Sequence, residues 1–190
     1  MRKVFAIDGW YFRIFSKLAN LMILNLLFIL SVIPIVTAGI GLMSLIKTVQ
    51  ELRQDEMLSV VTVYARNFKQ NIMRGLILLG VEVIGLAIPM SIIYLSLMYL
   101  PFLATLLMIV FSFVLLILSS FPLIYSLENQ ALIPALYQTI GFVTTKIALA
   151  IAIFIVPLVV GYLSFKVSLI FLFFMGISLI VYAQLSLMRR

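Results

Sequence analysis

The stretch from Asn25 to Asn71 reads NLLFILSVIPIVTAGIGLMSLIKTVQELRQDEMLSVVTVYARNFKQN, and it decides the fold. It starts as a hydrophobic run that is interrupted at Pro34, Thr37 and Gly39, and it ends in the only long polar segment between two strongly hydrophobic stretches. Proline inside an apolar helical run kinks or ends the helix. The stretch therefore predicts a broken membrane element, followed by a polar segment that lies outside the bilayer.

The composition places the whole chain in a membrane. Of its 190 residues, 65% are hydrophobic and 10% are charged, whereas soluble proteins have roughly 45–50% and about 25%. Lipid offers no hydrogen-bond partner to the backbone, so the spans should be α-helices. We expect an all-α, polytopic membrane protein in which residues 1–190 form one helical domain.

About five hydrophobic segments are expected. The first, residues 18–46, carries no charge and is longer than the ~20 residues of a straight span. Four more follow and predict a four-span bundle over residues 75–190: Gly75–Leu97, Phe102–Leu123, Ile147–Phe165 and Val167–Met188. Residues 125–145, which contain Glu128, Asn129 and Gln130, are predicted to be a polar connection between the third and fourth of the five segments.

The first element has two interpretations. It either crosses the membrane once as a kinked helix, or it turns back at Pro34–Gly39 as a helical hairpin, which makes six helical segments. A single crossing divides the 13 basic residues almost evenly between the two sides, whereas the hairpin leaves only Lys166 outside. The positive-inside rule favours the hairpin, with both termini in the cytoplasm. However, Ile35–Ile46 is short for a span unless it is re-entrant or continues past Lys47 with a snorkelling amine.

Two segments are predicted to lie at the membrane surface. Residues 1–17 should form an interfacial helix, because Asp8 can cap it and the aromatic run at residues 10–12 suits the headgroup region. Residues 47–74 should include an amphipathic helix on the cytoplasmic face, with an apolar side at helical spacing. Its expected contacts with anionic lipid or a protein partner are Arg66, Phe68, Lys69 and Arg74. A solvated loop is the alternative.

The residues available for chemistry are few, because the chain has no cysteine and no histidine. This excludes disulfides, thiol nucleophiles, imidazole bases and the usual zinc ligands. We expect no enzymatic activity, no cofactor and no metal site. The basic residues flank membrane segments instead of forming a soluble patch, so nucleic acid is not an expected partner.

Four polar residues in or near the apolar segments are candidates for an intramembrane site: Glu82, Asn20, Asn25 and Asn71. A carboxylate within a span costs about 2.5–3.5 kcal/mol on insertion scales unless it is neutralised, paired or hydrated. Glu82 is therefore either a functional group or part of a structural ion pair. For the asparagines, hydrogen bonding between helices is favoured over solute binding.

Three short runs carry a family resemblance: Asn25–Phe28, Pro34–Gly39 and Phe68–Asn71. Over about residues 20–75 they resemble the YesL-like bacterial membrane proteins, a family of undefined biochemical function that often has tryptophan at the position of Phe28. The resemblance implies a multi-pass protein of the bacterial inner (plasma) membrane, associated with carbohydrate uptake and its regulation. It supplies no catalytic or ligand-binding residue.

Three function classes follow in order of preference. The first is an accessory or regulatory protein that contacts a carbohydrate importer or sensor, because the only large polar surface is expected on the cytoplasmic side. The second is a small solute transporter that uses the broken first helix and Glu82, since broken helices often line solute sites. An intramembrane enzyme comes last, because Glu82 has no obvious carboxylate partner within the spans.

Overall fold

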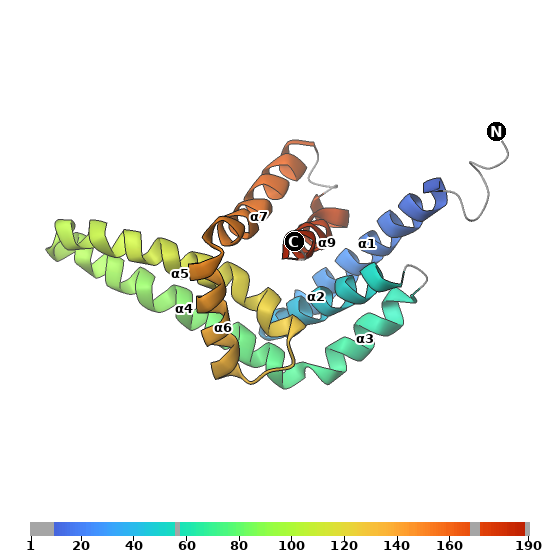
Figure 1. Ribbon diagram of the computed structural model, residues 1–190, viewed down its shortest axis with the longest axis horizontal. Coiled ribbons are helices and arrows are strands. Elements are labelled where there is room, and N and C mark those ends of the chain that lie inside the picture. Colours follow the sequence, from blue (N-terminus) through green and yellow to red (C-terminus); the bar gives the residue numbers. More distant parts are fainter. Residues whose placement is uncertain (1–9, 56–57, 168–171, 189–190) are drawn as a thin grey trace.

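The computed structural model describes residues 10–55, 58–167 and 172–188, which are almost entirely helical and contain no strand (Figure 1). The helices are α1 Trp10–Val32, η1 Ile35–Thr37, α2 Ala38–Gln54, α3 Val60–Gln70, α4 Ile72–Tyr99, α5 Pro101–Leu127, α6 Leu132–Thr145, α7 Ile147–Val167, the π-helix η2 Leu172–Gly176, and α9 Ile177–Met188. Five helical segments of the described chain are long and apolar enough to cross a membrane. The prediction of an all-α protein with several membrane-spanning helices is confirmed.

The first hydrophobic element is a hairpin. Helix α1 ends at Val32 and α2 begins at Ala38. The turn is held by Thr37, whose Oγ1 donates to the carbonyls of Ser31 and Pro34. After this turn α2 runs back beside α1 in the opposite direction (Figure 1). The structure therefore has the helical hairpin, and not the single kinked helix that was the other interpretation.

Helix α2 continues past Lys47, which is one of the two alternatives left open for the short second half Ile35–Ile46. The helix ends at Gln54, and the apolar segment Ile35–Gln54 has 20 residues. At a rise of 1.5 Å per residue this length is enough to cross the ~30 Å hydrocarbon layer. The polar segment predicted for residues 47–74 therefore starts with the last turns of α2, and only Val60–Gln70 forms a separate amphipathic helix.

The centre of the molecule is α2. It contacts α1, α3, α4, α5 and α9. In the most buried of the five candidate spans, Ile35–Gln54, 56% of the residues of its apolar stretch are buried inside the protein. The corresponding share is 17% or less in each of the other four. Four of the fully buried side chains of α2 belong to one core cluster with Leu24 of α1 and Ile153 of α7, and they are Leu45, Ile46, Val49 and Leu52. The other candidate spans expose many apolar side chains, as expected of helices that face lipid.

Two glycines let α2 and α4 cross at short range. A Cβ atom on Gly39 would lie 2.2 Å from the carbonyl oxygen of Gly75, and a Cβ on Gly75 would lie 2.4 Å from the Cα of Ile40. No other residue could occupy either position without moving a helix backbone. Close approach through small residues is a common way for membrane helices to associate. It places the start of α4 directly against α2.

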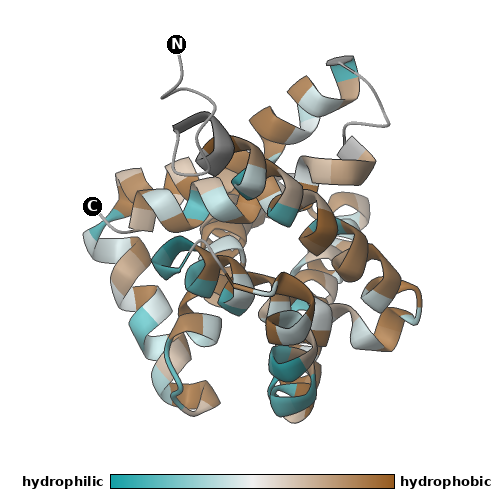
Figure 2. Cartoon of the chain, turned by 90° about the vertical axis from the view of Figure 1, so that its right-hand side faces the viewer, coloured by the Kyte–Doolittle hydropathy of each residue, from teal (hydrophilic) through white to brown (hydrophobic). Residues whose placement is uncertain are grey.

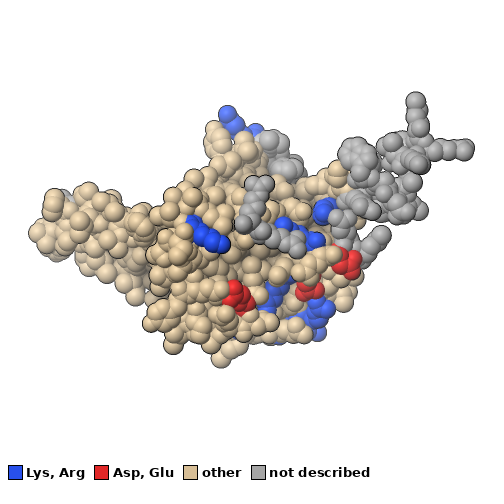
Figure 3. Space-filling model, viewed as in Figure 1, with Lys and Arg blue, Asp and Glu red and all other residues tan. Residues whose placement is uncertain are grey.

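Helices α4 and α5 form a long hairpin that projects to the left in Figure 1, with its tip near Tyr99 and Phe102. In the face seen in Figure 3 this projection carries no charged residue, and the charged residues lie over the rest of the molecule. When the molecule is turned by 90° and coloured by hydropathy, hydrophobic residues predominate along the helices (Figure 2). The side chains of the projecting hairpin are therefore suited to lipid contact.

Three segments differ from the sequence prediction. Residues 132–145, predicted as part of a polar connection, form helix α6. The predicted last span, Val167–Met188, is divided, because its described part consists of a π-helical turn and the shorter helix α9, and residues 168–171 lie outside the described residues. Of the predicted interfacial helix, residues 1–9 lie outside the described residues, and residues 10–17 continue without a break into α1.

Candidate functional site

The polar residues gather at one end of the molecule, which we call the polar end. It consists of residues 47–54 of α2, α3, the start of α4, the last turn of α5 and the α5–α6 loop (128–131). Helix α3 is fastened there to α2. Arg66 forms a 2.5 Å ion pair with Oε2 of Glu51. The side-chain amide of Asn67 donates to Oε1 of Glu51 at 3.0 Å and to the hydroxyl of Thr48 at 3.2 Å. Both carboxylate oxygens of Glu51 are therefore occupied by α3.

Tyr64 gives α3 a second attachment. Its hydroxyl lies 2.7 Å from that of Ser31 at the end of α1, and the ring is buried. Burial raises the pKa of Tyr64 to about 12, although the hydrogen bond to Ser31 opposes the shift. Val60, Val63 and Asn67 are buried on the same side of the helix. The predicted apolar side of this helix thus packs largely on the protein, and Phe68 is partly buried against the same core.

Next to α3, Lys47 brings three elements together. Its amine donates to Oδ1 of Asn71 at 2.7 Å and to Oδ1 of Asn129 at 3.3 Å. The amide of Asn71 donates in turn to the carbonyl of Asn67 at 2.6 Å, which joins the last turn of α3 to α4. Lys47 on α2 therefore holds the α3–α4 junction and the α5–α6 loop at the same point.

Arg74 holds the α5–α6 loop. Its guanidinium donates to the carbonyls of Tyr125, Glu128 and Gln130 at 2.7, 2.9 and 3.2 Å, and to Oδ1 of Asn129 at 2.9 Å. It also lies 4.5 Å from the centre of the Tyr125 ring. The last carbonyls of α5 have no partner within the helix and carry the negative end of its dipole. Arg74, predicted as a surface contact, therefore caps α5.

Beside these contacts lies an open polar pocket of about 330 Å³. We call it the Lys47 pocket. Its lining residues are Lys47, Gln50, Glu51, Arg66, Asn67, Gln70, Ser126, Leu127 and Asn129. Ser126 is 1% exposed, and its hydroxyl has no hydrogen-bond partner among the described residues.

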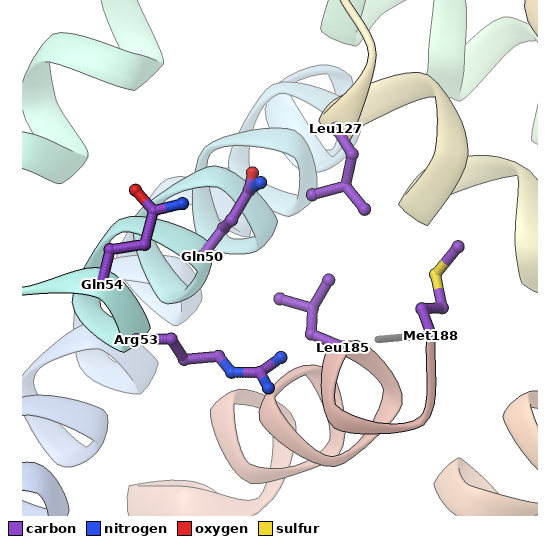
Figure 4. A pocket seen from close by; sticks show the side chains of 6 residues that line it. All are labelled: Gln50, Arg53, Gln54, Leu127, Leu185 and Met188. Carbon is purple, nitrogen blue, oxygen red and sulfur yellow. The ribbon is translucent and has the colours of Figure 1, made fainter. Parts of the chain in front are cut away.

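A smaller pocket of about 140 Å³ lies on the other side of Gln50 and Leu127, between α2 and α9. Figure 4 shows Gln50, Arg53 and Gln54 on α2 opposite Leu185 and Met188 near the end of α9. The guanidinium of Arg53 lies 5.4 Å from the centre of the Tyr182 ring. One wall of this pocket is polar and the other is apolar, so it offers fewer hydrogen-bonding groups than the Lys47 pocket.

Asn25, a predicted site residue, joins α1 to the divided last segment. Its amide donates to the carbonyl of Phe173 at 2.5 Å, and its Oδ1 accepts from the backbone N–H groups of Ile177 and Ser178 at 3.1 and 3.0 Å. Asn25 is completely buried. It satisfies backbone groups at the π-helical turn and at the start of α9, where the regular helical pattern is interrupted.

The other predicted intramembrane residues lie apart. Glu82 is half-buried on α4, and its Oε1 is buried without a hydrogen-bond partner among the described residues. Asn20 is half-buried on α1. In the described part of the chain, no side-chain hydrogen bond joins any two of Glu82, Asn20, Asn25 and Asn71. Of these four, only Asn71 belongs to the polar end, through Lys47.

Sequence reasoning missed Lys47, Ser126 and Asn129 as members of one site. The sequence pattern places Lys47 at the limit of a span and Asn129 in a polar connection. A cation inside the continuous helical pattern of residues 38–54 is the signal that could have indicated the site. However, the sequence does not show which distant residues contact this cation. Among the described residues, no group of three carboxylate, histidine or cysteine side chains could hold a metal ion.

The comparisons with known proteins agree with a family of uncharacterised function. The family model described as "Protein of unknown function, DUF624" matches residues 21–97, which cover most of α1, all of α2 and α3, and most of α4. No curated protein and no solved structure matches the chain. The matched region includes Lys47, Asn71 and Arg74 but not Ser126 or Asn129.

Proposed function

We propose that the chain is a non-catalytic accessory or regulatory protein of the bacterial inner membrane, which binds a membrane-protein partner through α3 on the cytoplasmic side. The observation that supports this role is the firm attachment of α3. Glu51, Asn67 and Tyr64 hold one face of the helix on α1 and α2. The rest of the helix surface presents exposed residues to solvent, which are Val61, Thr62, Ala65, Lys69 and Gln70. Arg66 is also exposed, although it pairs with Glu51.

A fixed helix of this kind suits recognition, because little side-chain or backbone freedom has to be lost when a partner binds. Val61, an apolar residue in the first turn of the helix, is 51% exposed on this mostly polar surface. Basic residues near the membrane surface also attract anionic lipid, with about 1 kcal/mol for each Lys or Arg. Anionic lipid is therefore a second expected contact of the same face.

The class of partner comes from the family resemblance over residues 20–75. The resembled family is associated with carbohydrate uptake and its regulation, so we propose an importer or a sensor for carbohydrate as the partner. The positive-inside rule supports a cytoplasmic position for the polar end and both termini.

A pair of charge reversals tests this proposal. Lys69 on α3 and Lys146 at the end of α6 are both exposed. After gentle detergent extraction from the native membrane, wild-type protein should co-purify with a stoichiometric importer or sensor component. Lys69→Glu should lose this partner, and Lys146→Glu should retain it. Solitary wild-type protein, or equal retention by both variants, would argue against recognition through α3.

The second candidate function is a small solute transporter, and Glu82 is the observation that favours it. Its half-buried carboxylate lies in a helix long enough to span the membrane, and one of its oxygens has no hydrogen-bond partner in the part of the chain that the structure describes. Intramembrane carboxylates often bind protons or solutes during transport. Purified protein that moves solute into liposomes, with loss of movement in Glu82→Gln but normal folding, would favour transport over the accessory role.

A further inference from the structure

We propose that the Lys47 pocket binds a phosphate group, carried by a small soluble molecule or by a phospholipid headgroup. The site is formed by Lys47, Ser126 and Asn129, with Gln50 and Gln70 at its sides. It requires neither the accessory role nor a transport role, because it follows from the hydrogen-bonding groups that the pocket leaves free.

The acceptors of the pocket are already used. Arg66 and Asn67 occupy the two carboxylate oxygens of Glu51. Oδ1 of Asn129 accepts from both Lys47 and Arg74. A neutral side-chain amide has one oxygen acceptor and one NH₂ donor group. Asn129 is thus left with its NH₂ group, which makes no hydrogen bond to another described residue.

Donors remain unused at the same place. A lysine ammonium has three N–H groups, and two of those on Lys47 are directed to Asn71 and Asn129. The buried hydroxyl of Ser126 has no partner in the described chain. A buried polar group that is left unsatisfied costs about 1–3 kcal/mol, so such a group usually has an unseen partner. A ligand that accepts hydrogen bonds from Lys47 and Asn129 would satisfy both, and a rotamer change of Ser126, which lines the pocket, would bring its enclosed hydroxyl to the same ligand.

The charge of the pocket favours an anion. Lys47 and Arg74 approach the same neutral oxygen of Asn129 at 3.3 and 2.9 Å. Among the described residues, no carboxylate lies within 4 Å of either cation, and the negative charge of Glu51 is paired with Arg66. Arg74 is balanced in part by the carbonyl end of α5. The Lys47 ammonium donates only to amide oxygens. The Glu51 carboxylate also lines the pocket and attracts Lys47, but the repulsion from Arg74 is the larger of the two effects, so an anion would relieve it.

Phosphate fits these features best. It offers several strong acceptor oxygens to donors that converge from different directions, and lysine is a common phosphate ligand. The pocket, at about 330 Å³, is larger than one phosphate group needs, and it leaves room for the molecule that carries the group. Either a soluble phosphate ester or the headgroup of an anionic lipid supplies the same chemistry.

The test uses the full-length protein and two probes. Glycerol 3-phosphate is titrated into protein in a neutral detergent, and phosphatidylglycerol is compared with phosphatidylcholine in nanodiscs. Binding is followed by ³¹P NMR and by thermal stability. A response to glycerol 3-phosphate identifies a soluble ester as the ligand class, and a response to phosphatidylglycerol alone identifies a headgroup. The proposal is wrong if neither probe binds at millimolar concentration.

Three variants locate the binding. Asn129→Asp places a carboxylate between Lys47 and Arg74, and it should weaken binding at least about tenfold while preserving or raising thermal stability. This variant remains informative even if Lys47→Gln does not fold. Ser126→Ala should weaken binding several-fold. Ser120→Ala is its matched control, because Ser120 is equally buried on α5, has no partner in the described residues, and does not line the pocket. Binding that Asn129→Asp leaves unchanged would overturn the assignment.

Discussion

The guanidinium of Arg74 donates a 2.7 Å hydrogen bond to the carbonyl of Tyr125 and lies 4.5 Å from the centre of the ring of the same residue. One side chain from the start of α4 therefore caps the end of α5 and packs against it. The loop that follows supplies Asn129 to the Lys47 pocket. The position of the pocket wall thus depends on a contact between two helices outside it.

Arg74→Gln should lower the free energy of unfolding by about 2–4 kcal/mol, because one carbonyl of the last turn of α5 and two carbonyls of the following loop lose a charged donor. Reversible unfolding in mixed micelles measures the change. The control is Arg53→Gln, which removes an arginine whose described contact is with the ring of Tyr182 and should cost about 0.5–1 kcal/mol. Equal losses in the two variants would show that Arg74 does not cap α5.

The glycine crossing of α2 and α4 gives a second prediction. Gly75→Ala should lower stability by about 1–3 kcal/mol, because the new methyl group would meet the backbone of Ile40 at 2.4 Å. Gly80→Ala on the same helix is the control, since its Cβ would meet nothing within 4 Å. That change should be neutral or stabilise the helix by up to about 1 kcal/mol. Similar effects of both substitutions would mean that the helices do not cross at Gly75.

Asn25 should matter more than Asn20. Asn25→Ala would leave the Phe173 carbonyl and the N–H groups of Ile177 and Ser178 without their partner, at a cost of about 2–3 kcal/mol. Asn20→Ala, in which no described hydrogen bond is lost, should change the unfolding free energy by less than about 0.5 kcal/mol. Reversible unfolding of both variants measures the two losses of unfolding free energy. Equal losses would show that Asn25 does not connect α1 to α9.

Tyr64 predicts a pH dependence. Its pKa in the folded protein is about 12, above the ordinary tyrosine value of about 10. The unfolded chain therefore loses this proton first, so the stability that Tyr64 contributes is complete below pH ~10 and is lost as the pH rises to ~12. Tyr64→Phe should flatten this part of the stability profile. An unchanged slope in Tyr64→Phe would contradict the burial of the phenol against Ser31.

Local patterns in the sequence were enough to predict the helical membrane class and the break at Pro34–Gly39. They were less decisive elsewhere. The sequence leaves open whether the second half of the first element stops near Ile46 or continues past Lys47, and the structure shows that it continues to Gln54, with the lysine amine bonded to Asn71 and Asn129. Residues 132–145 follow the polar run at Glu128 directly, so the sequence predicts a polar connection where the structure has the apolar helix α6.

The sites could not be predicted for a different reason. The partners of Asn25 are 148 to 153 positions away in the sequence, and those of Arg74 are 51 to 56 positions away. Polarity indicated that these side chains needed partners, but only the packing of the helices determines which ones they have. The neighbours of Glu82 on other helices could not be predicted either, because the sequence of its own segment does not show which helices pack against it.

Helices α1 and α2 form a hairpin, so we predict that the segments before α1 and after α2 share one side of the membrane. The chain has no native cysteine. Single cysteines at Lys3, Gln54 and Tyr99 can therefore be tested in intact cells with a membrane-impermeant thiol reagent. The hairpin predicts that Lys3→Cys and Gln54→Cys are protected and that Tyr99→Cys, at the tip of the α4–α5 projection, is labelled. Labelling of Gln54→Cys with protection of Lys3→Cys would establish a single crossing and contradict the hairpin.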